Sequence, residues 1–388
     1  MPKDFEKNFD EIFWYQADYT GFEDLYSDLK EISLPELDSF LSLAITLIPT
    51  QKIRLIESEE HIMTTICILR KKYSIPGPSY EDLEPLRNKA LIKQIAEKEG
   101  IPSAKFAIVN FEQVQDLEQE IEKIKTRIGK FPMFCKPVHG VGCGGSEKIE
   151  HENELRKWIH DMISTSKNAV YLVEEYVYGL EFNSAVCLLQ DGTWRPLQIT
   201  YFPEKGDRFE DCTESFPNMD KFVEKIIQIY KPPHPHLFTV QGFQLQRNTD
   251  NYYLTEMSYR PQGQRGTMLS YMYSGVGQET ALLSCHLDPN YTADPDPNRP
   301  KIYERHMWFP YKEGILRSHR ELDKSAPISS ELKFHWLAEP GTKLCKPQSY
   351  AHFLMCIKIC HEEKNKVLDD LKWIEENWRP DIIPLVGN

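Results

Sequence analysis

A lysine followed by a glycine-rich loop is the stretch of this sequence best suited to chemistry. Residues 131–146 read Phe-Pro-Met-Phe-Cys-Lys-Pro-Val-His-Gly-Val-Gly-Cys-Gly-Gly-Ser. The backbone N–H groups of such a loop can approach phosphate oxygens closely, and Lys136, at the end of a predicted strand, adds a positive charge. The loop has no Walker ending, and a hairpin rather than a dinucleotide-binding helix should follow it. By itself it fits a phosphate-binding loop and an ordinary glycine-rich hairpin equally well.

A second candidate is a pair of carboxylates at the end of an apolar strand. Glu174 and Glu175 lie in the hydrophobic run at 169–177, and Glu181 follows beyond a glycine. Buried carboxylates are costly unless they accept hydrogen bonds, and an adenine amino group and ribose hydroxyls are suitable donors. The simpler alternative is a strand that emerges into solvent with acidic ends.

A third candidate is the alternating set Glu256, Ser258 and Arg260. Residues spaced by two share one face of a strand, and Gln244 precedes them on the expected partner strand. A carboxylate beside an arginine can be a plain ion pair. It can also be a metal ligand beside an anion clamp, which phosphoryl transfer needs in order to neutralise the moving group.

In their order and spacing, these three segments resemble the ATP-grasp superfamily, and most closely its L-amino-acid ligase and carnosine-synthase-like carboxylate–amine ligases. Arg87-Asn88-Lys89 is similar to the family's Arg-Asp-Lys, and residues 136–145 are similar to its KPxxGxGSxG loop, with Cys143 in place of serine. The resemblance covers most of the chain. It implies an α+β ATP-grasp fold in which two α+β subdomains clamp ATP.

The resemblance also implies roles for individual residues. ATP would be bound by Lys89, Lys136, His139, Gly140, Gly142, Cys143, Gly144, Gly145, Glu174, Glu175, Tyr176, Val177 and Glu181. Magnesium (or manganese) would be bound by Glu256, Gln244 and Ser258, where the last two replace a glutamate and an asparagine of the family. Arg260 and Lys136 would be catalytic, with Arg260 holding the developing oxyanion.

The implied reaction converts a carboxylate into an acyl phosphate and joins it to an amine (or a thiol), releasing ADP and phosphate. The expected substrates are a small-molecule carboxylate and an amine, both of them amino acids in the simplest case. Gln244 and Ser258 offer neutral oxygens, which are poorer magnesium ligands than carboxylates. The alternative is therefore a catalytically impaired relative that binds nucleotide for a structural or regulatory role. A scaffold without nucleotide would leave the ordered spacing of the charged residues unexplained.

Composition limits the class of protein. The 46 basic and 59 acidic residues give a net charge of −13, which argues against nucleic acid as a partner. The longest apolar stretch, 41–48, is too short to cross a membrane, and no secretory signal precedes it. The nine cysteines occur singly, as in reduced intracellular proteins. We therefore expect a soluble, cytoplasmic protein, and the family resemblance allows a homodimer.

These residues need a scaffold of several elements to bring them together. We predict a pre-ATP-grasp region over 1–85 as a truncated α/β domain, an ATP-grasp core over 86–288 with halves at 103–176 and 177–288, and a small α+β lobe over 289–388. A linker rich in Asp, Asn and Pro at 289–300 sets the last boundary. His236 and His286 belong to groups without zinc spacing, so we expect structural roles for them.

Apolar periodicity and turn residues predict the individual elements. The expected helices cover 62–69, 87–99, 114–128, 155–162, 367–378 and a helix capped by Asn218. The expected strands cover 53–56, 105–109, 133–136, 169–177, 182–189, 193–201, 240–246, 252–257, 302–309 and 332–337.

Overall fold

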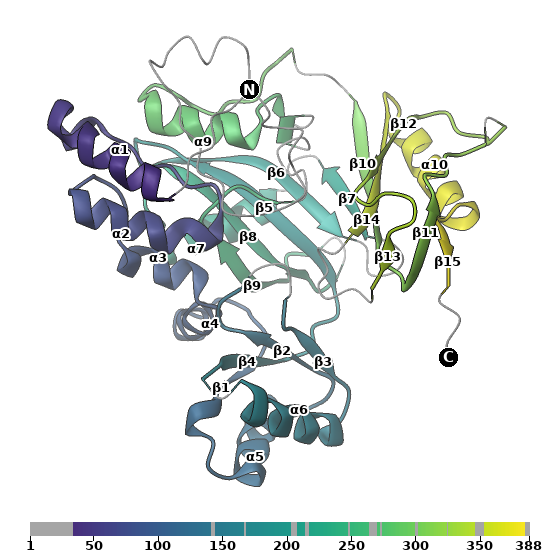
Figure 1. The fold of residues 1–388 in the computed structure, drawn as a ribbon, viewed down its shortest axis with the longest axis horizontal. Coiled ribbons are helices and arrows are strands. Elements are labelled where there is room, and N and C mark those ends of the chain that lie inside the picture. Colours follow the sequence, from purple (N-terminus) through teal and green to yellow (C-terminus); the bar gives the residue numbers. More distant parts are fainter. Residues whose placement is uncertain are drawn as a thin grey trace.

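The chain was analysed as a computed structural model. It describes residues 34–140, 144–166, 168–202, 208–213, 217–246, 249–263, 270–271, 274–298, 302–323, 325–345 and 353–384. Two main sheets divide the described residues, and Figure 1 shows the smaller sheet at the lower end of the molecule and the larger one across its middle. No described helix is long and apolar enough to cross a membrane.

The N-terminal part of the described chain is helical. It contains α1 (Leu34–Leu47), η3 (Thr50–Lys52), η4 (Glu60–Ile62), α2 (Met63–Tyr73), α3 (Tyr80–Arg87) and α4 (Lys89–Lys98). Ser79 forms a capping box with Asp82 at the start of α3, and the Asn88 side chain caps α4. The Asn88 cap explains why α4 begins at Lys89, two residues after α3 ends at Arg87.

The strand predicted at 53–56 is wrong, and the described residues before β1 contain no strand. Ile53 and Leu55 instead pack against the apolar cluster formed by α1 and α2. The alternation of apolar and polar residues at 53–56 resembles a half-buried strand, but its apolar side chains are buried against helices. The expected strand–helix unit of the N-terminal region is therefore a helical one over the described residues.

The small sheet has the order β1-β4-β2-β3, and all its neighbours are antiparallel. Its strands are β1 (Phe106–Asn110), β2 (Met133–Pro137), β3 (Glu147–Ile149) and β4 (Val170–Glu175). Helices α5 (Leu117–Ile128) and α6 (Glu152–Thr165) pack on one face, because each places its apolar residues three or four positions apart. The glycine loop connects β2 to β3.

The large sheet is antiparallel with the order β12-β14-β10-β7-β6-β5-β8-β9. Its strands are β5 (Leu180–Leu188), β6 (Trp194–Phe202), β7 (Arg208–Thr213), β8 (His236–Gln244), β9 (Tyr252–Ser258), β10 (Tyr303–Pro310), β12 (Glu331–Trp336) and β14 (Phe353–His361). α7 (Pro217–Tyr230) packs with α3 and α4 on one face of β5 and β8, and α9 (Gln278–Leu287) packs on the other.

Strands β10, β12 and β14 of the C-terminal residues extend this large sheet. β10 pairs with β7 on one side and with β14 on the other, so strands from before and after the predicted linker belong to the same sheet. α10 (Lys364–Asn377) and a three-stranded sheet of β13 (Lys343–Leu344), β11 (Gly314–Ser318) and β15 (Asp381–Ile383) complete this end. The domain boundaries proposed from the sequence stay predictions.

Most of the predicted elements are confirmed, and so is the α+β class. Sequence periodicity missed β14, the strand that pairs with both β10 and β12, because it reads as a continuous apolar run next to a loop. The predicted cap at Asn218 is wrong, since α7 begins one residue earlier, at Pro217.

Candidate active site

Three charged side chains form a buried cluster where α4 meets the small sheet. Lys136 lies on β2 and its Nζ is 2.5 Å from Oε2 of Glu174 on the neighbouring strand β4. The Nζ of Lys93 lies 2.7 Å from Oε1 of the same carboxylate. None of the three side chains is more than 6% exposed. Both predicted residues, Lys136 and Glu174, are therefore together, and both oxygens of Glu174 face lysines.

Lys93 is a site residue that the sequence analysis missed. It lies one helical turn after Lys89 and also donates to the Leu254 carbonyl of β9, at 2.8 Å. Burial lowers the pKa of its ammonium below the ordinary value. Burial alone would raise the pKa of Glu174, but the charges of Lys136 and Lys93 outweigh it and hold that pKa low. The signal in the sequence was a lysine on the apolar face of a helix, four residues after a predicted phosphate ligand.

Lys89 connects the glycine loop to the large sheet. Its Nζ donates to the Gly140 carbonyl at 2.7 Å and lies 3.3 Å from Oε2 of Glu256 on β9. The Glu256 side chain is 31% exposed. Burial would raise the pKa of its carboxyl, but Lys89 and Lys136 lower it further than burial raises it. The predicted Lys89, Gly140 and Glu256 therefore meet at one place.

The glycine loop is partly described. Gly140 and Gly145 have φ angles of +134° and +72°, a region that favours glycine, and Gly144 and Gly145 are exposed. Nε2 of His139 lies 2.9 Å from Oε1 of Glu84 on α3, so the imidazole faces that helix. The predicted Gly142 and Cys143 lie outside the described residues.

The residues predicted to surround adenine and ribose follow β4. Glu175 points away from Glu174, as neighbours on a strand must, and its Oε1 accepts from the Lys105 amide at 3.2 Å. The Tyr176 amide donates to the Pro132 carbonyl at 3.0 Å. Val177 begins the connection to the large sheet, and Glu181 lies on β5.

The structure does not bring the predicted metal ligand Gln244 to Glu256. Gln244 pairs with Tyr252, whose ring lies in the core under α7, and the Gln244 amide donates to the Thr249 carbonyl at 2.9 Å. Glu256 pairs with Gln241 instead. Gln241 and Gln244 are three residues apart on β8, so they lie on opposite faces of the sheet.

The side chains that share the sheet face of Glu256 are therefore Gln241 and Ser258. Ser258 pairs with Thr239 and so shares the face of Gln241 and Glu256, as expected from the spacing of two. Among the described residues, no group of three His, Cys, Asp or Glu side chains could hold a metal ion alone. One carboxylate with neutral oxygens beside it fits magnesium, which completes its shell with phosphates and water.

Arg260 follows β9 and pairs with a carboxylate from the N-terminal region. Its Nε lies 3.5 Å from Oε2 of Glu60, and the two side chains are 18% and 11% exposed. Glu60 begins η4, far from Arg260 in the sequence. No pattern in the sequence pointed to Glu60, because only the tertiary fold places it there.

A buried polar network fixes the backbone beyond Arg260. The Gln262 amide donates to Oε1 of Gln278 on α9 at 2.6 Å, and its side-chain oxygen accepts from Gln198 on β6 at 2.7 Å. Ser270 donates to Gln198 at 2.8 Å and accepts from Gln278 at 3.0 Å. A satisfied network of this kind holds Gln262 and Ser270 in place against α9 and β6.

A family model described as the D-ala D-ala ligase C-terminus matches residues 95–207 of this chain. The matched part contains Lys136, the glycine loop, Glu174 and Glu181. It ends before Glu256 and Arg260.

Longer similarities extend over nearly the whole chain. The chain is 21% identical to the L-arginine-specific L-amino acid ligase of Bacillus subtilis over 343 residues, which are 84% of this chain and 79% of that protein. It is similar to the structure of the L-amino acid ligase from Bacillus licheniformis, with a TM-score of 0.66, 14% identity, and coverage of 92% and 88% of the two chains. It is also similar to the biotin carboxylase domain of Hydrogenobacter thermophilus 2-oxoglutarate carboxylase bound to MgADP, with a TM-score of 0.63, 13% identity, and coverage of 94% and 83%. At these identities the solved structures establish a shared fold.

Proposed function

This chain is an ATP-grasp carboxylate–amine ligase, and on that premise we propose that it uses MgATP to activate the carboxylate of an α-amino acid and joins it to an amine. The observation that carries the proposal is the convergence of four cations, Lys89, Lys93, Lys136 and Arg260, where two sheets and α4 meet. Each cation is paired with a carboxylate. Phosphate groups of a nucleotide would find a set of positive charges already fixed in position.

Nucleotide binding is assigned first to the lysines and the glycine loop. Lys89 and Lys136 would face the phosphates, together with His139 and the backbone of Gly140, Gly142, Cys143, Gly144 and Gly145. Glu174 would serve as the counter-ion that holds Lys93 and Lys136, since both its oxygens face their ammonium groups. The Tyr176 carbonyl, Val177 and Glu181 remain the proposed contacts for adenine and ribose.

Magnesium is assigned to Glu256 with Gln241 and Ser258. When bound, the ion would neutralise charge on the β and γ phosphates. Glu256 would exchange its contact with Lys89 for the metal, which leaves the Lys89 ammonium for a phosphate oxygen. Gln241 provides the amide oxygen that Gln244, on the other face of β8, cannot provide.

The pair of Arg260 and Glu60 suggests which acid is activated. An α-amino acid carries a carboxylate beside an ammonium, and the pair presents a guanidinium 3.5 Å from a carboxylate. We assign the substrate carboxylate to Arg260 and its ammonium to Glu60. The substrate carboxylate would then take the place of Glu60 beside Arg260, and the substrate ammonium would take the place of Arg260 beside Glu60.

The chain's residues act by position and charge. Lys89 and Lys136 orient the phosphates toward the carboxylate that Arg260 holds. A carboxylate oxygen attacks the γ phosphorus and ADP leaves, which gives the acyl phosphate. Arg260 then stabilises the oxyanion as the amine attacks the acyl carbon. The amine forms the new carbon–nitrogen bond, and phosphate leaves with one former carboxylate oxygen. Positioning of this kind supplies up to about 7–11 kcal/mol of rate acceleration, and no side chain needs to form a covalent intermediate.

The test is ADP release by the purified chain with MgATP and pools of amino acids. We expect release only when a free α-amino acid is present, and none when N-acetyl amino acids are the only carboxylates, because they lack the ammonium that Glu60 would bind. Glu60→Gln should remove most of this activity, whereas Glu59→Gln, a change at an exposed neighbour, should not. ADP release that is the same with and without amino acids would contradict the proposal.

A cytoplasmic location is also proposed. The seven cysteines whose side chains the structure describes are free thiols, and five of them are buried, which supports a reducing compartment. Homodimerisation remains a prediction from the family resemblance.

A further inference from the structure

We infer that Arg70, which lies outside the proposed site, is a positioning residue for the amino-acid pocket. It holds the segment that carries Glu60 against the end of β9 that carries Arg260. This inference rests on the proposed function, because it concerns the same pair of side chains.

Arg70 is a buried hub on α2. Its two terminal nitrogens lie 3.1 Å and 2.5 Å from the two carboxylate oxygens of Glu57, and neither side chain is more than 5% exposed. The guanidinium also donates to the Leu55 carbonyl at 2.5 Å and to the Pro78 carbonyl at 3.4 Å. A planar fork with several donors can hold these groups together, whereas a lysine cannot.

The segment that Arg70 holds has no regular structure of its own. Residues 53–59 form neither helix nor strand, and Glu60 begins η4 directly after them. Glu57 is three residues from Glu60, so the Arg70 contacts limit the positions that Glu60 can occupy. Buried ion pairs contribute little net stability, but they do specify geometry in some proteins.

The neighbouring turn is built to accept Arg70. Gly77 has a φ of +148°, and a Cβ at this position would lie 2.5 Å from Nε of Arg70. A side chain at Gly77 would displace the guanidinium. The turn at 74–78 therefore closes around the hub.

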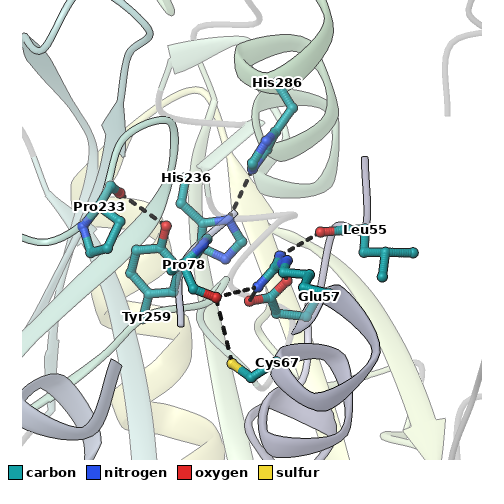
Figure 2. A network of polar contacts seen from close by, with 9 residues as sticks. Leu55, Glu57, Cys67, Pro78, Pro233, His236, Tyr259 and His286 are labelled. Carbon is teal, nitrogen blue, oxygen red and sulfur yellow. Dashed lines mark hydrogen bonds and ion pairs between the residues drawn. The ribbon is translucent and has the colours of Figure 1, made fainter. Parts of the chain in front are cut away.

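Tyr259, the residue before Arg260, is held by contacts of its own on the β9 side of the pocket. The ring of Tyr259 stacks on His236 with 4.1 Å between centroids, and its hydroxyl donates to the Pro233 carbonyl at 2.9 Å. Nδ1 of His236 lies 3.1 Å from Nε2 of His286 on α9. Figure 2 shows Tyr259 and His236 beside Pro78 and Glu57, and the charge of Arg70 is close enough to act on the pKa of both Tyr259 and His236.

Both histidines, His236 and His286, are neutral, so they add no positive charge near Arg70. Burial lowers the pKa of His236 to about 3 and that of His286 to about 3. An uncharged pair does not repel the Arg70 guanidinium. Glu60 thus follows the segment that Arg70 holds, and Arg260 follows Tyr259, whose ring stacks on His236.

The test compares Arg70→Lys and the milder Glu57→Gln with a matched control. Lys72→Ala removes an ion pair from the same helix, because Nζ of Lys72 lies 2.6 Å from Asp38 on α1. With the amino acid that supports wild-type turnover, we expect both hub variants to raise its KM or lower kcat about 10–100-fold, since misplacement by about 1 Å has such effects. The KM for ATP should stay within about twofold, as should every constant of Lys72→Ala.

Hydrogen exchange on the same variants needs no substrate and so separates this inference from the proposed function. We expect faster exchange at 53–62 and 258–262 in Arg70→Lys and Glu57→Gln, and wild-type exchange there in Lys72→Ala. Hub variants with unchanged exchange in these peptides, or with lower stability but unchanged amino-acid kinetics, would overturn the inference. A wild-type chain that turns over no amino acid would instead contradict the proposed function, and the exchange result would still decide the hub.

Discussion

Each lysine of the site is balanced by a carboxylate in the structure without ligand. Glu174 lies between Lys93 and Lys136, and Glu256 lies beside Lys89. This arrangement keeps the cations from repelling one another before the nucleotide arrives. Binding then exchanges one set of charged partners for another, rather than burying new charges.

Lys136→Ala should weaken nucleotide binding strongly. Loss of one charge-assisted contact to phosphate costs about 1.5–3 kcal/mol, or roughly 10–150-fold in affinity, and Glu174 then turns fully to Lys93. Calorimetric titration with ATP and magnesium measures the effect. Lys130→Ala, at a side chain that is 68% exposed, is the control and should bind as the wild type does. Normal ATP binding by Lys136→Ala would place the site elsewhere.

Gln241→Glu and Gln244→Glu should behave differently. A carboxylate at 241 faces Glu256 and should lower the magnesium concentration needed for half-maximal activity by roughly tenfold. A carboxylate at 244 would be buried on the helix-covered face, where Gln244 is 7% exposed, and should cost about 1–3 kcal/mol of stability without changing the magnesium requirement. A stronger magnesium response in Gln244→Glu than in Gln241→Glu would contradict the assignment.

The residue types of the site were predictable from motifs, whereas their partners were not. Lys136, Glu174 and Glu256 were found because strand ends and glycine spacing identify them. Lys93 and Glu60 were missed because a charged residue on a helix or in a loop has no spacing that reveals its partner. Their roles follow only from the tertiary fold.

At the scale of elements, α4 and the β8–β9 hairpin position most of the site. α4 carries Lys89 and Lys93 one turn apart, so one lysine faces the large sheet and the glycine loop while the other faces the small sheet. The hairpin carries Glu256 and its partner Gln241. A register shift between Gln241 and Gly242 sets which side chains of β8 oppose which residues of β9.

The family motif pointed to Gln244 as a metal ligand, but in the hairpin Gln244 pairs with Tyr252, four residues from Glu256. An extra residue on β9 shifts the register by one and brings Gln241 opposite Glu256. Bulges depend on packing, here of Gly242 against the Phe182 ring, and have no dependable signature in one sequence. The strands themselves were predicted within a few residues.

The histidine contact between β8 and α9 should make stability depend on pH. The folded-state pKa values of His236 and His286, about 3, lie below the ordinary value of 6.5. The unfolded chain therefore binds more protons as the pH falls below 6.5, and the free energy of unfolding should decrease down to about pH 3. The slope is at most about 1.4 kcal/mol per pH unit for each histidine.

Thermal unfolding between pH 8 and pH 5 measures this effect. His286→Gln should lose less stability on acidification than the wild type does, because one of the two neutral histidines is gone. His160→Gln, at a side chain that is 73% exposed, should show the wild-type slope. Equal slopes for His286→Gln and the wild type would contradict the role given to the buried pair.

At the scale of the whole molecule, one sheet joins the site to the C-terminal residues. β10 and β14 continue the sheet from β7, although a segment without helix or strand at 288–298 separates them in sequence. A linker rich in Asp, Asn and Pro suggested a separate lobe. The composition of residues 289–300 indicates an irregular segment, but it does not indicate that the strands after this segment join the same sheet as the strands before it.

A chain that ends at residue 288 should not fold as a stable unit. Without β10, strand β7 would lose its pairing partner and become an exposed edge of the sheet. We expect aggregation or the absence of a cooperative thermal transition, with no ATP binding. A soluble truncated chain that unfolds cooperatively and binds ATP would show that the two parts are independent domains.

The most direct test of the central claim follows an oxygen atom. The purified chain is supplied with MgATP, an amine and the amino acid that supports ADP release, labelled with oxygen-18 in its carboxylate. Formation of an acyl phosphate predicts one labelled oxygen in each phosphate released, in step with amide product. Amide formation with unlabelled phosphate, or ADP release without any amide, would contradict the account.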